Sequence, residues 1–174
     1  MSKNLNIIII AASNGKNLEL ANQFQRNATD LKLSSKVLDL TAMNIPLFNP
    51  RNEPSKHIPQ SIHDLKDNLF LAEKWIICAP EYNGSIPPIL SNSIAWLSIL
   101  GEDFRELFNG RPIAISTYSG GLGLELLIAL RIQLAHLGSQ VLGRQLSAAN
   151  FKPPDEKSIQ DILNRLIQMK KIEL

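Results

Sequence analysis

Three short segments of this chain combine glycine, hydroxyl and amide residues in a pattern suited to binding an anion or a flat ring. They run from Ala12 to Asn17, from Pro80 to Pro88 and from Ser116 to Gly123, and each lies at the end of an aliphatic run. Glycine lets a ligand approach main-chain N–H groups, and the N–H groups that start a helix favour negative charge. The sequence therefore predicts a binding site built mostly from backbone.

The segment from Pro80 to Pro88 is the most distinctive of the three. It contains more turn-forming residues than a plain strand-to-helix connection requires. Its prolines stiffen the backbone, and Gly84 allows a flat ligand to approach closely. Tyr82 has two interpretations that chemistry alone leaves open, an aromatic wall of the site or an ordinary packing residue.

The other two segments each have a functional and a plain interpretation. In the first, Ser13, Lys16 and Asn17 would add donors and positive charge to a helix N-terminus, although short polar turns are common at such places. In the third, the three glycines between positions 120 and 123 expose backbone N–H groups or simply permit a tight turn.

Aliphatic runs alternate along the chain with helical patterns. Strands are expected over Leu5 to Ala11, Ser35 to Leu40, Trp75 to Ala79, Pro112 to Thr117 and, more weakly, Gln140 to Leu142. Helices are expected over Leu18 to Asn27, Ile58 to Ala72 with Pro59 in its first turn, Ile89 to Leu100, Leu122 to Leu137, and Glu156 to Lys170 with Asp155 as N-cap.

Five strands alternating with five helices predict an α/β fold, a three-layer sandwich around a five-stranded parallel sheet. The flavodoxin-like strand order 2-1-3-4-5 fits best. In that order the chain reverses direction between strands 1 and 3, and ligands bind at the carboxyl ends of the strands there. The three segments would meet at this edge.

Composition limits the class of protein. The chain has 174 residues, 44% of them hydrophobic, which predicts one domain over residues 1–174. Its net charge of +2 without a basic run argues against a nucleic-acid partner. Its apolar runs are far shorter than the roughly 20 residues that cross a bilayer. The lone Cys78 and the lack of a cleavage site after Met1 to Asn4 predict a cytoplasmic protein without a membrane partner.

The second segment resembles a known family. Pro80-Glu81-Tyr82-Asn83-Gly84-Ser85-Ile86-Pro87, followed by Leu90, Asn92, Ile94 and Trp96, is similar to the P-E-Y-N-x-S-x-P motif of NAD(P)H-dependent FMN reductases. This flavodoxin-like family includes azo-dye and quinone reductases. Gly120-Gly121-Leu122-Gly123, with Leu130-Arg131 downstream, resembles its second glycine-rich loop. The similarity spans residues 5 to about 143.

The resemblance implies which residues hold the flavin. The FMN phosphate would bind at Ser13, Lys16, Asn17 and Leu18. One edge of the ring would lie along Pro80, Glu81, Tyr82, Asn83, Gly84 and Ser85, and its pyrimidine end near Tyr118, Ser119, Gly120 and Gly121. No side chain would be catalytic, because the flavin N5 carries the chemistry. Glu81 is interpreted as a structural partner of loop backbone rather than a general base.

The sequence also departs from the family pattern. The first loop is about three residues shorter and lacks an arginine, Leu124 stands where a glycine is usual, and Ser91 and Ala95 replace a lysine and an aspartate. Two functions therefore stay open. The favoured one is an FMN-dependent oxidoreductase that passes a hydride from NAD(P)H via bound flavin to a quinone, an azo compound or a flavin. The alternative is a non-catalytic binding or sensing module that has weakened or lost FMN binding.

The remaining candidates have plainer interpretations. The three histidines, at positions 57, 63 and 136, lack metal-ligand spacing and are expected to be surface or packing residues, with no metal site. Cys78 is expected to fill core space. The segment from Thr41 to His57 is either a functional loop or a surface excursion. The apolar residues of the third helix could pack in the core or form a subunit contact, and the resemblance, which implies a homodimer or homotetramer, favours the contact; they are Trp96, Leu97, Ile99 and Leu100.

Overall fold

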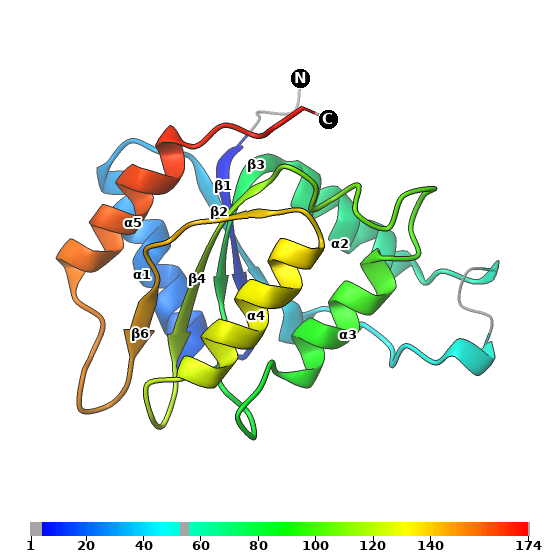
Figure 1. The fold of residues 1–174 in the computed structure, drawn as a ribbon, viewed down its shortest axis with the longest axis horizontal. Helices are drawn as coiled ribbons and strands as arrows, with labels where there is room; N and C mark the ends of the chain where they lie inside the picture. The colour runs from blue at the N-terminus through cyan, green and yellow to red at the C-terminus, as the bar shows by residue number, and fades with distance from the viewer. Residues whose placement is uncertain (1–4, 53–55, 174) are drawn as a thin grey trace.

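A parallel sheet lies at the centre of the molecule, with helices on both faces (Figure 1). This computed structural model describes residues 5–52 and 56–173. Two predicted features lie outside the described residues. They are Met1 to Asn4, where the sequence predicts no cleavage site, and residues 53–55 of the loop expected from Thr41 to His57. The strands are β1 (Leu5–Ala11), β2 (Ser35–Asp39), β3 (Ala72–Cys78), β4 (Pro112–Tyr118), β5 (Gln140–Val141) and β6 (Leu146–Ala148). Their order is β2-β1-β3-β4-β5, which confirms the predicted flavodoxin-like arrangement.

The aliphatic run of β1 is continuous because both faces of the strand are covered. Ile8 and Ile10 face one hydrophobic core, whereas Ile7 and Ile9 face the other. Side chains alternate between the two faces of a strand, so a strand buried on both faces has apolar residues at every position. All four isoleucines are almost fully buried.

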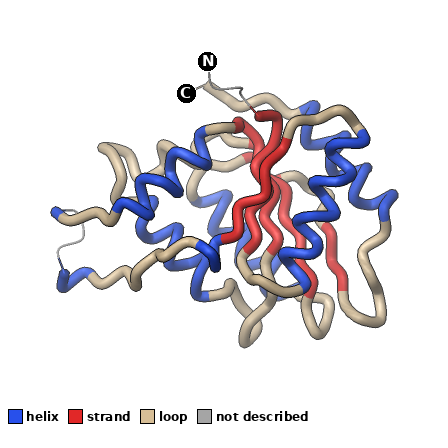
Figure 2. The backbone as a smooth tube through the Cα atoms, turned by 180° about the vertical axis from the view of Figure 1, so that it is seen from behind, coloured by secondary structure: helices blue, strands red, loops and turns tan. Residues whose placement is uncertain are grey.

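The helices form the two outer layers. On one face lie α1 (Lys16–Asp30) and α5 (Glu156–Gln168), and on the other α2 (Gln60–Phe70), α3 (Pro88–Leu97) and α4 (Leu124–His136) (Figures 1 and 2). The Asp155 carboxylate accepts a hydrogen bond of 2.9 Å from the Ser158 N–H, which confirms it as an N-cap. Pro59 precedes α2 at the N-cap position instead of lying in its first turn. Of the described helices, none has the length and hydropathy to cross a membrane.

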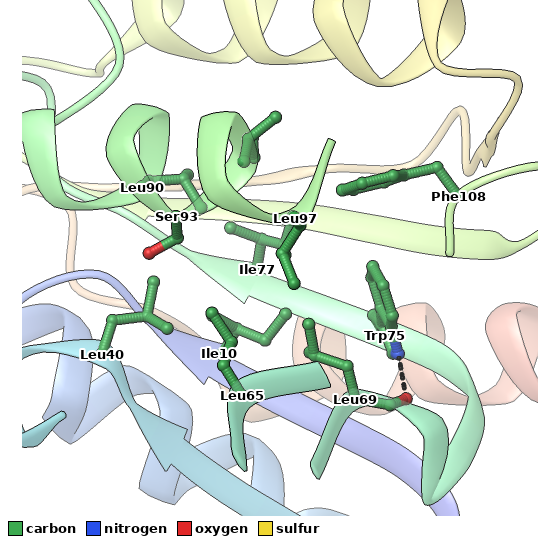
Figure 3. A pocket seen from close by; sticks show the side chains of 11 residues that line it. Ile10, Leu40, Leu65, Leu69, Trp75, Ile77, Leu90, Ser93, Leu97 and Phe108 are labelled. Carbon is green, nitrogen blue, oxygen red and sulfur yellow. Dashed lines mark hydrogen bonds between the residues drawn. The ribbon is translucent and has the colours of Figure 1, made fainter. Parts of the chain in front are cut away.

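The core between the sheet and the α2–α3 layer holds a small cavity (Figure 3). Its volume is about 20 Å³, and its walls are almost entirely aliphatic and aromatic, including Ile10, Leu65, Trp75 and Phe108. A cavity of this size and polarity is a packing defect that stays dry, because water there would find no hydrogen-bond partner.

The expected subunit contact on the third helix is wrong for most of its residues. Trp96, Leu97 and Leu100 are each 5% exposed and belong to the core of this chain. The Trp96 indole N–H donates to the Pro46 carbonyl at 2.7 Å, and the Phe48 ring packs edge-on against the indole. These contacts hold the first part of the segment from Thr41 to His57 against α3.

The sheet also gains a strand that was not predicted. Strand β6 pairs with the last three residues of β4, from Ser116 to Tyr118, whereas β5 pairs with the first two. The two short strands thus share one edge of β4 in succession. Three residues are too few to show a periodic pattern in a sequence.

Candidate functional site

The three predicted segments do meet at one edge of the sheet. They follow β1, β3 and β4, which are neighbours in the sheet, and their loops lie together along the lower edge in Figures 1 and 2. The helices that follow them, α1, α3 and α4, all begin at this edge. The edge therefore presents three helix N-termini, whose free N–H groups favour negative charge.

Asn17 ties the first loop to the third. It is the second residue of α1, is 1% exposed, and lies 101 positions before Tyr118. Its side-chain amide donates to the Tyr118 carbonyl at 2.8 Å and accepts from the Tyr118 N–H at 2.9 Å. Both polar ends of the amide are therefore engaged, and they fix the position of the backbone at the end of β4.

Ser119 and Glu81 tie the second loop to the third. The Ser119 hydroxyl oxygen accepts from the Glu81 N–H at 2.8 Å and lies 2.7 Å from the Thr117 hydroxyl. The Glu81 carboxylate accepts from the Leu126 N–H, in the first turn of α4, at 3.2 Å. Glu81 thus acts as a structural partner of backbone, as expected. We call the hydrogen-bonded set of Asn17, Glu81 and Ser119 the loop clamp.

The second loop ends in a tight turn that explains part of its motif. The Tyr82 and Ser85 backbones exchange hydrogen bonds of 3.1 and 3.0 Å. Between them, Asn83 and Gly84 both have positive φ, 51° and 69°. Two consecutive residues of this kind define a type I′ turn, for which Asn-Gly is the preferred pair. The turn projects Tyr82, Asn83 and Gly84 into solvent, with Tyr82 50% exposed.

The N-terminus of α1 is open to a ligand. Gly15 occupies its N-cap position, and within the described chain no side chain caps the helix there. Lys16 follows, with its ammonium group 2.9 Å from the Glu19 carboxylate and 5.8 Å from the centre of the Tyr118 ring. The hydrogen bond and the charge of Glu19 raise the pKa of Lys16, so this side chain carries a positive charge at neutral pH.

Three glycines at this edge leave space that the described chain does not fill. A Cβ atom placed on Gly15, Gly120 or Gly121 meets none of its atoms within 4 Å. None of the three has a positive φ that would itself require glycine. Internal packing therefore gives no reason for glycine here, whereas close approach of a ligand would.

Sequence reasoning missed the contribution of β6 and the turn that follows it. The Ser119 N–H donates to the Ala148 carbonyl at 3.0 Å, and the Tyr118 hydroxyl donates to the Asn150 side chain at 3.2 Å. Phe151, next to Asn150, is 72% exposed. Asn150 thus joins the rim of the site from a segment whose sequence carried no recognisable signal.

The other predicted site residues lie around the loop clamp. Ser13, Leu18 and Tyr118 are half-buried, Pro80 is buried, and Ser85, Gly120 and Gly121 are exposed. Cys78, at the end of β3, is fully buried, and burial raises its pKa to about 12, which confirms it as a core residue. All three histidines are exposed, and the described residues contain no cluster suited to a metal ion.

Comparisons with known proteins agree with this geometry. A family model described as NADPH-dependent FMN reductase matches residues 5–153. The chain is 31% identical to a quinone reductase of Escherichia coli (strain K12) over 103 residues, 58% of this chain and 53% of that protein. It is 25% identical to an NADPH azoreductase of Bacillus sp. (strain OY1-2) over 117 residues, 66% of this chain and 61% of that protein. The chain thus spans between about half and three fifths of the length of these two relatives.

Solved structures show the same fold. The flavoenzyme NAD(P)H:(acceptor) oxidoreductase FerB from Paracoccus denitrificans superposes with a TM-score of 0.75 at 20% identity, covering 95% of this chain and 96% of that one. A flavodoxin from the domain Archaea has a TM-score of 0.62 at 14% identity, covering 95% of this chain and 96% of that one.

Proposed function

This chain belongs to the NADPH-dependent FMN reductase family, and from that premise we propose that it is an FMN-dependent oxidoreductase. It would oxidise NAD(P)H and reduce a small acceptor, either a quinone, an azo compound or a flavin. Residues 1–174 would act as a single FMN-binding domain. The names of the quinone reductase and azoreductase relatives support these acceptor classes.

The observation that carries the proposal is the combination of the loop clamp with glycines that leave open space. The clamp holds three loops at the edge where α1, α3 and α4 begin. Gly15, Gly120 and Gly121 leave room that a side chain would fill. An anionic phosphate beside a helix N-terminus and a flat ring against exposed backbone both fit these features.

The proposed roles of the site residues follow from their positions. The first loop, with Ser13, Lys16, Asn17 and Leu18, would hold the FMN phosphate, Asn17 by its backbone because its amide is engaged by Tyr118. The turn from Pro80 to Ser85 would border one edge of the ring, and the segment from Tyr118 to Gly121 would approach its pyrimidine end. Bound FMN supplies the redox chemistry, so the residues need only bind and orient it.

The direct test is to titrate the purified chain with FMN and then add NADPH without oxygen. We expect saturable binding followed by loss of the flavin absorbance near its visible maximum. Gly120→Ala and Gly121→Ala should each weaken binding at least about tenfold, as for a methyl group forced into a packed contact. Gly143→Ala is the matched control, because its Cβ also meets open space but lies between β5 and β6, outside these three loops.

Lys16 and Glu19 provide a finer test of the phosphate position. Lys16→Ala should weaken FMN binding about tenfold, the effect of losing one charge-assisted contact. Glu19→Ala should strengthen it, because the Lys16 ammonium would no longer be paired with the carboxylate. Riboflavin, which has no phosphate, is the control ligand, and neither substitution should change its binding. Equal effects on FMN and riboflavin would remove Lys16 from the phosphate site.

A second candidate function, a non-catalytic binding or sensing module, is favoured by one observation. Lys16 is engaged by Glu19 and the Asn17 amide by Tyr118, so two of the predicted phosphate donors already have partners in the chain. This candidate predicts that added FMN neither binds nor supports NADPH oxidation. The same titration therefore separates the two functions.

We also propose that the chain forms a homodimer or homotetramer. The support is the outer face of α4, where Leu124, Ile128 and Ile132 follow one another at one-turn spacing and are 48%, 60% and 66% exposed. Light scattering on the wild type and on Ile128→Lys would test it. A wild type that is monomeric at all concentrations would refute it. A cytoplasmic location stays a prediction from the sequence.

A further inference from the structure

A buried arginine lies at the edge of the sheet opposite the three loops. Arg111 directly precedes β4 and is only 2% exposed. Its guanidinium carbon lies 4.2 Å from the centre of the Trp75 ring. Its Nε donates to the Leu107 carbonyl at 2.5 Å, and its Nη1 donates to the Ala72 carbonyl at 2.6 Å. The guanidinium thus packs against the Trp75 ring and links the Leu107 and Ala72 carbonyls.

Its positive charge is not balanced by an ion pair. Among the described residues, no carboxylate lies within 4.0 Å of the Arg111 guanidinium. Two of its five N–H donors are used, which leaves three. Burial lowers the pKa of Arg111 to about 10, and the charge of Glu73 partly offsets this effect. A buried cation without a counter-ion is costly, and an anion from outside the chain would reduce that cost.

The arginine lines an open hollow large enough for a small molecule. The hollow measures about 410 Å³ and is lined by Phe70, Ala72, Glu73, Arg111, Lys170, Lys171 and Glu173. Three cations therefore face two carboxylates. The Glu73 carboxylate is turned partly away, since it lies 3.8 Å from the Lys74 ammonium and its side chain is 68% exposed. The Phe70 ring, 45% exposed, supplies an apolar wall.

The two lysines reach this hollow because the C-terminal tail is held in place. The Ile172 N–H donates to the Gly110 carbonyl at 3.0 Å, and the Gln140 side-chain amide donates to the Lys170 carbonyl at 2.7 Å. Gly110 has a φ of 68°, and a Cβ there would lie 2.2 Å from the Ile172 carbonyl oxygen. Only glycine permits this close approach, so the backbone next to Arg111 is matched to the tail.

We propose that this hollow binds the phosphate group of a small phosphate monoester, with Arg111, Lys170 and Lys171 as its cationic contacts and Phe70 against its organic part. A monoester phosphate carries nearly two negative charges at neutral pH, which suits a site with one buried guanidinium and two lysine ammonium groups. The planar guanidinium with unused donors matches phosphate oxygens better than a single ammonium does. This site is separate from the three loops and does not depend on FMN binding.

Adenosine monophosphate is the probe, with adenosine as the control ligand that lacks the phosphate. Calorimetry on the wild-type chain, with and without saturating FMN, should show binding with a Kd of about 1 mM or tighter, unchanged by FMN. The double substitution Lys170→Ala/Lys171→Ala should weaken it about tenfold. Lys157→Ala, which removes one exposed lysine from α5, should leave it unchanged.

Three outcomes would overturn the proposal. The first is that adenosine monophosphate does not bind at a concentration of about ten times the expected Kd. The second is that adenosine binds with the same affinity as adenosine monophosphate. The third is that adenosine monophosphate competes with FMN and that its binding is lost in Lys16→Ala. Both results together would place the nucleotide at the three loops. Because Arg111→Gln can fail to fold, the lysine pair in the exposed tail carries the test. Trp75 fluorescence gives a second readout, since its ring lies against Arg111.

Discussion

The two edges of the sheet attract negative charge in different ways. At the carboxyl edge, α1, α3 and α4 begin, so backbone N–H groups point toward a ligand. At the amino edge, helices end and carbonyl groups accumulate. There the guanidinium of Arg111 donates to the Leu107 and Ala72 carbonyls. Positive potential comes from backbone at one edge and from side chains at the other.

This difference has an energetic consequence. Backbone N–H groups carry only partial charges, so they offer an anion site without burying an ion. A buried guanidinium loses the hydration of a full charge, and its hydrogen bonds and its ring contact offset only part of that loss. We therefore expect substitution of the buried Arg111 at the amino edge to change stability most, and substitution of Asn17 at the carboxyl edge to change both stability and FMN binding.

The largest effect is expected from Arg111→Gln. The substitution removes two charge-assisted hydrogen bonds and the packing on Trp75, and it leaves the Ala72 and Leu107 carbonyls without their donor. We expect the free energy of unfolding to fall by about 3 kcal/mol, measured by urea denaturation. Arg111→Lys should recover only part of this loss, because a single ammonium cannot donate to both carbonyls and also keep the guanidinium's contact with the Trp75 ring.

The control for this prediction is the tail pair. Lys170→Ala/Lys171→Ala removes two charges from the same hollow, yet neither lysine makes a side-chain hydrogen bond or ion pair within the described residues. The free energy of unfolding of this double variant should stay within about 0.5 kcal/mol of the wild-type value. A double substitution that destabilises as much as Arg111→Gln would show that general electrostatics, not the buried hydrogen bonds, governs this edge.

The next largest effect is expected from Asn17→Ala at the carboxyl edge. It leaves the partly buried Tyr118 N–H and carbonyl without their side-chain partners, which should cost about 2 kcal/mol of stability in the same urea measurement. FMN binding should weaken too, because the first and third loops would no longer be held together. Asn14→Ala in the same loop, at an exposed position, should change neither quantity. Loss of FMN binding in Asn14→Ala instead would assign the phosphate contact to that residue.

The two edges also differ in what the sequence reveals. The carboxyl edge depends on local patterns, such as the Asn83-Gly84 turn after a buried strand, so its three loops were predictable. Its cross-links were not, because Asn17 and Tyr118 are 101 residues apart and nothing in either segment identifies the other as partner. At the amino edge, Arg111 precedes a strand like any polar residue. Its burial follows from the tail and from Trp75, both distant in sequence.

The errors in the predicted fold have the same cause, because local sequence patterns do not show which distant residues will cover a segment. The start of β3 at Ala72 was missed because two charged residues, Glu73 and Lys74, interrupt the aliphatic pattern there. Trp96 and Leu97 were interpreted as a subunit contact because an apolar helix face does not show what covers it. In the structure, Phe48 and Pro46 cover part of that face.

A smaller effect is expected from Glu81→Ala, which tests the link between the second loop and α4. It removes the acceptor for the Leu126 N–H in the first turn of that helix, so the loss should be about 1 kcal/mol, as for a helix cap. Thermal denaturation would measure it. Glu125→Ala, an exposed acidic residue of the same turn, is the control and should cost less. Equal losses would mean that Glu81 acts only through its charge near the helix N-terminus.

The smallest effect concerns the N-termini of two helices, α5 and α1. Helix α5 is capped by the Asp155 carboxylate, whereas α1 begins at Gly15 without a side-chain cap among the described residues. Hydrogen bonds from Ser158 lower the pKa of Asp155 below its ordinary value of 3.8. Its contribution to stability is therefore complete above that pH and disappears as the pH falls through the lowered pKa.

The difference in stability between the wild type and Asp155→Ala should accordingly be constant from pH 7 to about pH 5 and shrink toward pH 3. Thermal melts at several pH values would measure it. Asp155→Asn keeps an oxygen acceptor but cannot titrate, so its advantage over Asp155→Ala should not change with pH. If the stability difference between the wild type and Asp155→Ala also does not change with pH, the negative charge of Asp155 adds nothing to the helix cap. In that case the uncapped N-terminus of α1 would have to attract an anion through its N–H groups and Lys16, with little help from the helix dipole.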